Sequence, residues 1–205
     1  ICELWHFFER QMGRSIHMVF AEDLEEALDQ LTVLFVPEGG LAIADDSKVK
    51  DWIQQGGKLI VMGAAVYDFA GKEGYDISRM NPTNDSLKPV AFSKQERDQI
   101  SNNIIGAIFP CELDATNPLA FGYDTYYTLR QSAEHFDLGS NNVFHLKKEA
   151  KAENGFVGYR VKKQQSEASI AGYQSYGTGT IIYFIDNPLF RGFWESGKLM
   201  IANAV

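Results

Sequence analysis

Two short apolar runs with a helix signal between them limit the folds open to this chain. The runs are TVLFVP, residues 32–37, and KLIVMG, residues 58–63. Between them, Asp46 or Ser47 can cap a helix that Gly56 ends. Short buried strands joined through a helix usually pair in parallel, because parallel strands need a crossover connection. The pattern therefore predicts an α/β domain built on a parallel sheet.

Further segments continue the alternation of strands and helices. Helices are expected at residues 3–12, 23–30 and 199–205, and strands at residues 15–20 and 179–186. The apolar residues of the first helix recur at helical spacing, and the strands are bounded by Gly, Pro or Asp. We expect the strands at residues 58–63 and 179–186 to lie parallel in one sheet.

The middle of the chain has a different character. Residues 71–103 are polar and rich in turn formers, which predicts an irregular surface excursion that ends in a helix at residues 93–103. The following residues, 104–186, hold several short β-rich runs. These runs either extend the sheet or form an antiparallel lobe. The whole chain, residues 1–205, is expected to be one domain.

Composition excludes several classes of protein. A formal net charge of -8 argues against a nucleic-acid phosphate surface or a basic membrane patch, because both need a local excess of Lys and Arg. No run of 18 apolar residues occurs, so no membrane span is expected. Cys2 and Cys111 are too few for a disulfide framework and match no metal-site spacing. They are expected to be partly buried thiols, although a bridge between them stays open in an oxidising compartment. Nothing in the sequence indicates an oligomeric state.

Four stretches together resemble a known family. They are TVLFVPEGG (32–40), VKDWIQQGGKLIVMG (49–63), LDATNPLAFGY (113–123) and TGTIIYFIDNPLFRGFW (178–194). This order is similar to the class I glutamine amidotransferase-like domain at the C-terminal end of bacterial secreted zinc carboxypeptidases of the carboxypeptidase A type. The resemblance implies a flavodoxin-like sheet with helices on both faces and a β-rich insertion or extension.

The same resemblance implies a setting for the domain. It implies that the numbered residues are an excised C-terminal segment, and that a strand before residue 3 belongs to the fold but precedes them. It also implies a secreted or periplasmic protein whose partner is the upstream peptidase domain of the same chain. Zinc is expected in that peptidase domain, and no cofactor is expected in this segment.

Active amidotransferases of this class use a cysteine at a strand-to-helix elbow, a glycine-rich donor loop, and a late His and Glu. The thiolate needs a base, and the tetrahedral oxyanion needs preorganised donors. By the resemblance, Gly63 stands at the cysteine position, and Asp186 with Asn187 stands where the His and Glu would follow the last strand. Residues 37–40 keep the donor loop. A vestigial, non-catalytic site is therefore expected.

A set of zinc-like ligands has a simpler explanation. His6 and Glu9 have H-x-x-E spacing, and His135 follows more than a hundred residues later, much as in a zinc carboxypeptidase. His6 and Glu9 fall in an amphipathic helix between aromatic residues, however, and the other peptidase residues have no counterpart here. We interpret all three as ordinary surface or core residues.

Several polar residues follow predicted strand ends, where open α/β sheets bind ligands. The candidates are Glu38, Gly39, Gly40, Tyr67, Asp186, Asn187 and Arg191. One interpretation is a vestigial pocket for a small polar ligand or a peptide end. The other, which we favour, is structural: Asp186 and Asn187 cap the last helix, and Arg191 pairs with an acid.

Three functions follow from these patterns. The first is a non-catalytic accessory domain of a secreted zinc metallocarboxypeptidase. The second is a binding module for a small ligand or carbohydrate in the cleft at the strand ends. The third is a hydrolase with an unrecognised nucleophile, for which Ser47 and Cys111 are weak candidates because neither has a visible His partner.

Overall fold

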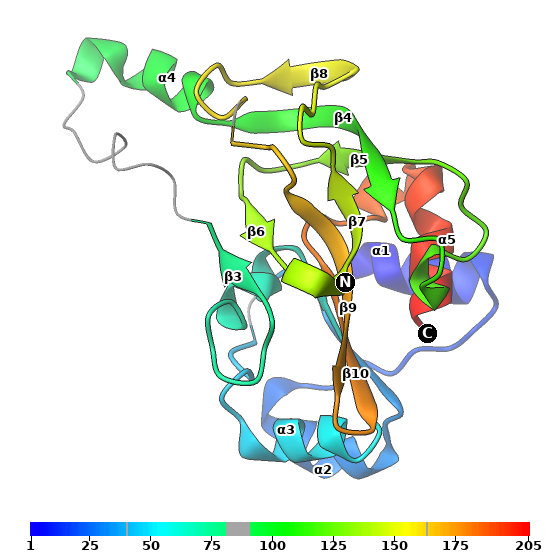
Figure 1. Cartoon of the computed structure of the whole chain (residues 1–205). Helices are drawn as coiled ribbons and strands as arrows, with labels where there is room; N and C mark the ends of the chain where they lie inside the picture. Colours follow the sequence, from blue (N-terminus) through cyan, green and yellow to red (C-terminus); the bar gives the residue numbers. More distant parts are fainter. Residues whose placement is uncertain (40, 81–90, 163) are drawn as a thin grey trace.

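The computed structural model describes residues 1–39, 41–80, 91–162 and 164–205. Within these residues the main feature is an eight-stranded mixed sheet with strand order β1-β2-β10-β9-β7-β4-β5, to which β8 adds by pairing with β4 (Figure 1). The strands are β1 (Val33–Val36), β2 (Lys58–Met62), β4 (Ile104–Leu113), β5 (Tyr126–Arg130), β7 (Asn142–Leu146), β8 (Asn154–Val157), β9 (Ser169–Tyr176) and β10 (Gly179–Phe184).

The parallel part of the sheet matches the prediction. β2 lies between β1 and β10 and is parallel to both, with Ile60 opposite Phe35 on one side and Ile182 on the other. The remaining pairs, from β10 and β9 through to β4 and β5, are antiparallel. The β-rich half of the chain therefore extends the same sheet instead of forming a separate lobe.

Helices cover both faces of the sheet. α1 (Cys2–Trp5), the π-helix η1 (His6–Gln11) and α5 (Glu195–Ala204) pack on the face that carries Ile60 and Met62. α2 (Leu24–Ala27) and α3 (Ser47–Gln54) pack on the face that carries Leu59 and Val61. Successive residues of β2 thus enter opposite cores, as expected for a strand buried on both faces. The predicted fold class is confirmed.

Local signals account for α3. The Asp46 carboxylate accepts hydrogen bonds from the backbone N–H groups of Lys48, at 2.8 Å, and Val49, at 3.3 Å, so Asp46 is the N-cap. Gly56, just after the helix, has a φ of 119°, which favours glycine. Val49 and Ile53 are fully buried beneath the sheet.

Residues 15–20 do not form the strand that their pattern predicts. They have no regular secondary structure, and among the described residues no strand pairs with them. Met18 and Phe20 are both 72% exposed. The physical reason is that a strand needs a neighbour for its backbone groups, and among the described residues β1 has a partner only on its β2 side.

The excursion after Gly71 is partly ordered. It includes β3 (Ser78–Arg79), which pairs with β6 (Phe136–Asp137), and the predicted helix, observed as α4 (Phe92–Ser101). Residues 81–90 lie outside the described part. Short 3-10 helices complete the chain: η2 (Ala21–Asp23), η3 (Leu28–Gln30), η4 (Gly63–Asp68), η6 (Pro118–Ala120), η7 (Gly139–Asn141) and η8 (Phe190–Gly192).

None of the helices in the described ranges has the length and apolar character needed to cross a bilayer.

Candidate functional site

The elbow after β2 keeps its backbone shape without a reactive atom. β2 ends at Met62, and η4 begins directly at Gly63, whose φ is 61°. A nucleophile elbow forces its central residue into such a strained turn, so that the side chain stands clear of the sheet. Gly63 has no side chain to present. It therefore tolerates the geometry without strain and contributes no nucleophile.

Glu38 occupies the space that an elbow side chain would need. A Cβ atom added to Gly63 would lie 2.3 Å from Glu38 Oε1 and 2.4 Å from Glu38 Cγ. Glu38 follows β1, so the parallel pairing of β1 and β2 brings these two strand ends together. The structure thus brings Glu38 and Gly63 together. Gly39, next to Glu38, is exposed with a φ of 128°, and Gly40 lies outside the described residues.

Asp186 is committed to a buried ion pair. Its Oδ2 lies 3.1 Å from Nη1 of Arg130, and neither side chain has more than a few per cent of its surface exposed. The pair lacks hydrogen-bond geometry, so that among the described residues neither Asp186 Oδ2 nor Arg130 Nη1 has a hydrogen-bond partner. Asp186 Oδ1 instead accepts the Gln131 N–H at 2.9 Å. Burial raises the pKa of Asp186, while the Arg130 charge acts in the opposite direction.

Arg130, the ion-pair partner of Asp186, was not identified from the sequence. It is fully buried at the end of β5, and its Nη2 donates to the carbonyl oxygens of Ser132 and Glu134. A signal was present: Tyr126, Thr128 and Arg130 alternate along β5 and all three are buried. A charged residue on the buried face of a strand needs a partner, and Asp186 is that partner.

Asn187 and Arg191 form a loop held by Glu3. The Asn187 side-chain oxygen accepts the Leu189 N–H at 2.8 Å, so Asn187 caps the turn before η8 and does not cap α5. The Glu3 carboxylate accepts from the Asn187 amide and from the Arg191 backbone N–H. The predicted pairing of the Arg191 side chain with an acid is therefore replaced by a backbone contact. Its guanidinium lies over the Phe190 ring, 5.1 Å from the centroid.

Tyr67 belongs to a separate cluster on η4. Its ring meets Phe136 edge-on, with centroids 5.3 Å apart, and the Arg79 guanidinium lies 4.9 Å from the ring centroid. Arg79 also forms an ion pair with Glu134 at 2.8 Å. Burial, and next the Glu134 carboxylate, raise the pKa of the Tyr67 hydroxyl above its ordinary range. The Tyr67 hydroxyl therefore stays neutral near neutral pH, and the residue is 39% exposed.

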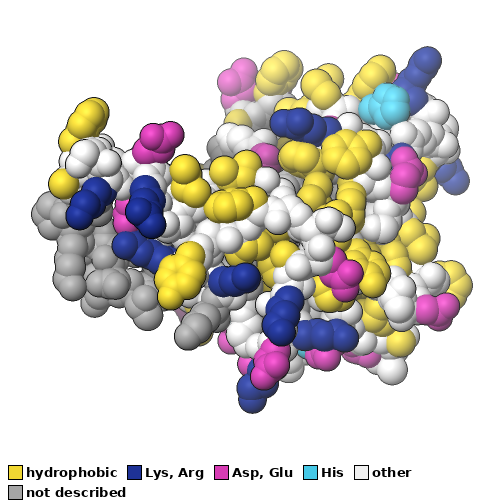
Figure 2. Space-filling model, turned by 90° about the horizontal axis from the view of Figure 1, so that it is seen from above, with side chains coloured by type: hydrophobic (Ala, Val, Ile, Leu, Met, Phe, Trp, Pro, Cys, Tyr) yellow, Lys and Arg dark blue, Asp and Glu magenta, His cyan; other side chains and the backbone are white. Residues whose placement is uncertain are grey.

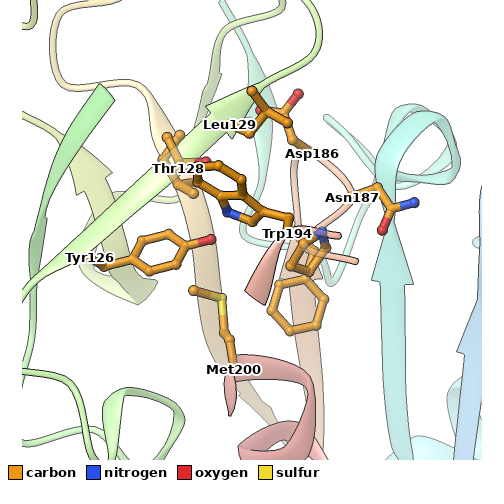
Figure 3. A pocket seen from close by; sticks show the side chains of 10 residues that line it. Tyr126, Thr128, Leu129, Asp186, Asn187, Trp194 and Met200 are labelled. Atoms are coloured by element: carbon orange, nitrogen blue, oxygen red, sulfur yellow. The ribbon is translucent and has the colours of Figure 1, made fainter. Parts of the chain in front are cut away.

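The candidate residues do not share one pocket. Asp186 and Asn187 line a cavity of about 10 Å³, together with Tyr126, Thr128 and Trp194 (Figure 3). That volume suits a single water molecule, and the Trp194 indole N–H has no hydrogen-bond partner in the part of the chain that the structure describes. Glu38 and Gly39 instead line a groove of about 920 Å³ on the far side of β1. Residues that a binding module would bring together in one cleft at the strand ends therefore line two different cavities.

The two cysteines are free thiols with different surroundings. Cys2 is exposed, whereas Cys111 lies in the interior of β4. Burial raises the pKa of the Cys111 thiol to about 12. A thiolate is the nucleophilic form of cysteine, so Cys111 is a poor nucleophile at neutral pH. Ser47, the other weak candidate, is the first residue of α3.

Thiol reactivity tests this difference directly. We expect an aromatic disulfide reagent at pH 7.5 to modify one thiol per native chain within minutes, and the second at least tenfold more slowly. Cys2→Ala should remove the fast phase, and Cys111→Ala should leave it intact. Unfolding in guanidinium should make both thiols react at the same rate. A fast phase that survives Cys2→Ala would contradict the assignment.

The zinc-like set is dispersed. Within the described ranges, no three His, Cys, Asp or Glu side chains gather closely enough to hold a metal ion. His135 is half-buried, and burial lowers its pKa.

Comparison with solved structures identifies the fold. A ThuA-like protein from Parabacteroides merdae matches 98% of this chain and 81% of its own, with a TM-score of 0.57 and 11% identity. A cytoplasmic protein from Salmonella typhimurium LT2 matches with a TM-score of 0.55 and 10% identity, over 97% of this chain and 83% of its own. A second Salmonella typhimurium cytoplasmic protein has a TM-score of 0.52 and 14% identity, over 98% and 83%. No protein-family model and no curated protein sequence matches the chain.

These likenesses define a class by its fold. The chain has the class I glutamine amidotransferase-like fold, a flavodoxin-like sheet that it shares with ThuA-like proteins. At these identities the likeness shows the fold alone, and function has to be argued from the site.

Proposed function

We propose that this chain is a non-catalytic accessory domain of a secreted zinc metallocarboxypeptidase whose peptidase domain lies upstream in the same polypeptide. The observation that supports this most is the Glu38 side chain in the space above Gly63. A domain that kept amidotransferase chemistry would need a nucleophile there and free space for an acyl group. The link to a carboxypeptidase, and with it the proposed secreted or periplasmic location, rests on the sequence resemblance.

The former base position supports the same proposal. Asp186 and Arg130 neutralise one another in the core, and Asn187 is held by Glu3 and Gln131. Groups that are buried and bonded in this way stabilise a loop and do not move protons to a substrate. The zinc and the peptide-cleaving residues would belong to the upstream domain.

The surface offers a place for a neighbouring domain. Figure 2 looks down on the end of the molecule that carries α4, β4 and β8, and hydrophobic side chains are spread across it between Lys and Arg side chains. Ile105 of β4, Phe156 of β8 and Tyr159, which follows β8, have exposed side chains. Exposed apolar side chains rimmed by charge are typical of interdomain contacts.

The absence of catalysis is testable on the 205-residue chain. We expect no ammonia release from glutamine and no release of C-terminal residues from peptides, with or without added zinc, above a heat-denatured control. Gly63 supplies no nucleophile, and the Asp186 region supplies no base. A steady turnover that persists through purification and disappears on a single substitution would overturn the proposal.

The peptidase link needs a separate test. We expect the coding sequence upstream of Ile1 to encode a signal peptide and a metallocarboxypeptidase domain with its zinc ligands. The corresponding full-length protein should bind one zinc ion per chain and release C-terminal residues. A coding sequence that starts close to Ile1, or that encodes a domain of another class, would defeat the link while leaving the non-catalytic reading intact.

A further inference from the structure

Three polar side chains line one small cavity between β5 and the start of α5. Tyr126 and Thr128 have their side chains on the same buried face of β5, and Trp194 directly precedes α5. In Figure 3 the Tyr126 hydroxyl and the Trp194 indole nitrogen point toward one another. Tyr126 and Thr128 are only 3% and 2% exposed. Polar groups at this depth need hydrogen-bond partners, because burial removes them from water.

The three groups do not satisfy one another directly. Burial raises the pKa of the Tyr126 hydroxyl, and the nearby Trp194 indole and Thr128 hydroxyl act in the opposite direction. Across the described part of the chain, however, the buried indole N–H has no partner at hydrogen-bond geometry. An indole N–H can only donate, whereas a hydroxyl both donates and accepts. One small molecule with both capacities would therefore satisfy all three groups.

The cavity beside these groups has the size of one water molecule. Its volume of about 10 Å³ is close to the least that a water needs, and a buried water typically makes about three hydrogen bonds. The wall also includes the buried apolar residues Ile170, Phe184 and Met200. A larger molecule does not fit this volume, and a metal ion would lack enough oxygen ligands. Water is therefore the ligand that matches both the volume and the polar groups.

The other polar side chains of the wall, those of Asp186 and Asn187, are already engaged. Asp186 Oδ2 lies 3.1 Å from Nη1 of Arg130, so its charge is compensated. The Asn187 amide group donates to the Glu3 carboxylate. Its side-chain oxygen accepts the Leu189 N–H at 2.8 Å. Among the side chains of this wall in the described residues, the indole N–H is thus the donor left without an acceptor.

We propose that this cavity binds one long-lived water molecule, which accepts the Trp194 indole N–H and bonds to the hydroxyls of Tyr126 and Thr128. The water joins the start of α5 to the middle of β5. Any other occupant of the cavity has to replace the hydrogen bonds of this water, which disfavours an apolar ligand. The inference goes beyond the accessory role, and it holds whether or not the chain belongs to a peptidase.

The three tryptophans of the chain supply the controls for the test. Trp52 donates its indole N–H to the Leu31 carbonyl oxygen at 3.0 Å, and Trp5 is 42% exposed. Nuclear magnetic resonance measures magnetisation transfer from water to each indole N–H in the laboratory and rotating frames. A bound water gives cross-peaks of opposite sign in the two frames, whereas chemical exchange gives the same sign. We expect opposite signs at Trp194, exchange alone at Trp5, and no cross-peak at Trp52.

Thr128→Val is the matched variant, because it replaces the hydroxyl by a methyl group of similar size. It should lower the bound-water signal at Trp194 by more than half, whereas Thr128→Ser, which keeps a hydroxyl, should retain it. A crystal structure of the parent chain should show one water within hydrogen-bond distance of all three side chains. A dry cavity with a direct bond from Trp194 to Tyr126 would overturn the proposal. An equal signal in the parent and in a folded Thr128→Val variant would also overturn it.

Discussion

Arg130→Met is expected to lower the free energy of unfolding by about 3–5 kcal/mol, the usual cost of leaving one partner of a buried ion pair alone. Arg130 is fully buried, and Asp186 has no other charged partner within salt-bridge distance in the described residues. Removing the guanidinium leaves a carboxylate without compensation and two backbone carbonyls, of Ser132 and Glu134, without their donor. Urea unfolding followed by circular dichroism measures the loss.

The double variant Arg130→Met with Asp186→Leu is the control for this loss. It should recover more than half of the stability, because an apolar pair of similar volume needs no compensation. A double variant as unstable as the single one would mean that Arg130 acts through packing or through its carbonyl contacts. The ion pair would then not be the source of the effect.

The pH dependence of Arg130→Met follows from the same pair. Burial raises the pKa of Asp186 in the folded protein, so the folded state holds a proton more tightly than the unfolded state. The contribution of Asp186 to stability is then largest below its ordinary pKa and falls as the pH rises toward the raised folded value. Without the Arg130 charge the folded pKa of Asp186 rises further, so this fall in stability should become larger and extend to higher pH. The difference between parent and variant should therefore be smaller at pH 4.5 than at pH 7.

Gly63→Cys is expected to destabilise the chain by about 1–3 kcal/mol and to restore no amidase activity. Gly63 has a φ of 61°, where a residue with a Cβ is strained, and the new Cβ would meet Glu38 at 2.3 Å. The cysteine would also lack a base, because Asp186 is paired with Arg130. Thermal unfolding and an ammonia-release assay with glutamine measure the two effects.

Removing Glu38 separates the two causes of the destabilisation. Glu38→Ala alone should change stability by less than about 0.5 kcal/mol, since Glu38 is exposed. In the double variant with Gly63→Cys, the contact with Glu38 is gone and only the backbone strain remains. Full recovery in the double variant would show that the turn itself is unstrained. Appearance of amidase activity would mean that a base exists near the elbow after all.

Much of the fold could be predicted from the sequence. β2 and α3 were predictable because each carries its own signal: an unbroken apolar run for a strand buried on both faces, and a capped, amphipathic pattern for the helix. The parallel placement of β2 and β10 was also predictable, since both carry the nearly continuous apolar run that is typical of parallel strands buried on both faces. Residues 15–20 were wrongly predicted. Their pattern is also typical of a strand, but a strand forms only where a neighbouring strand can hydrogen-bond to its backbone.

Some features of the candidate site were likewise predictable from the sequence, and others were not. Sequence alone determined that the elbow has no nucleophile, because Gly63 is a glycine in any fold, and it placed Glu38 and Asp186 at strand ends. Only the tertiary structure decided that Glu38 fills the space above Gly63, that Asp186 is neutralised by Arg130, and that an open edge and groove lie beside β1. The reason is physical: a residue's type and local backbone depend on near neighbours in the chain, whereas pairing and burial depend on groups brought together from distant positions. Arg130 and Asp186 are 56 residues apart by their numbers, and no local pattern joins them.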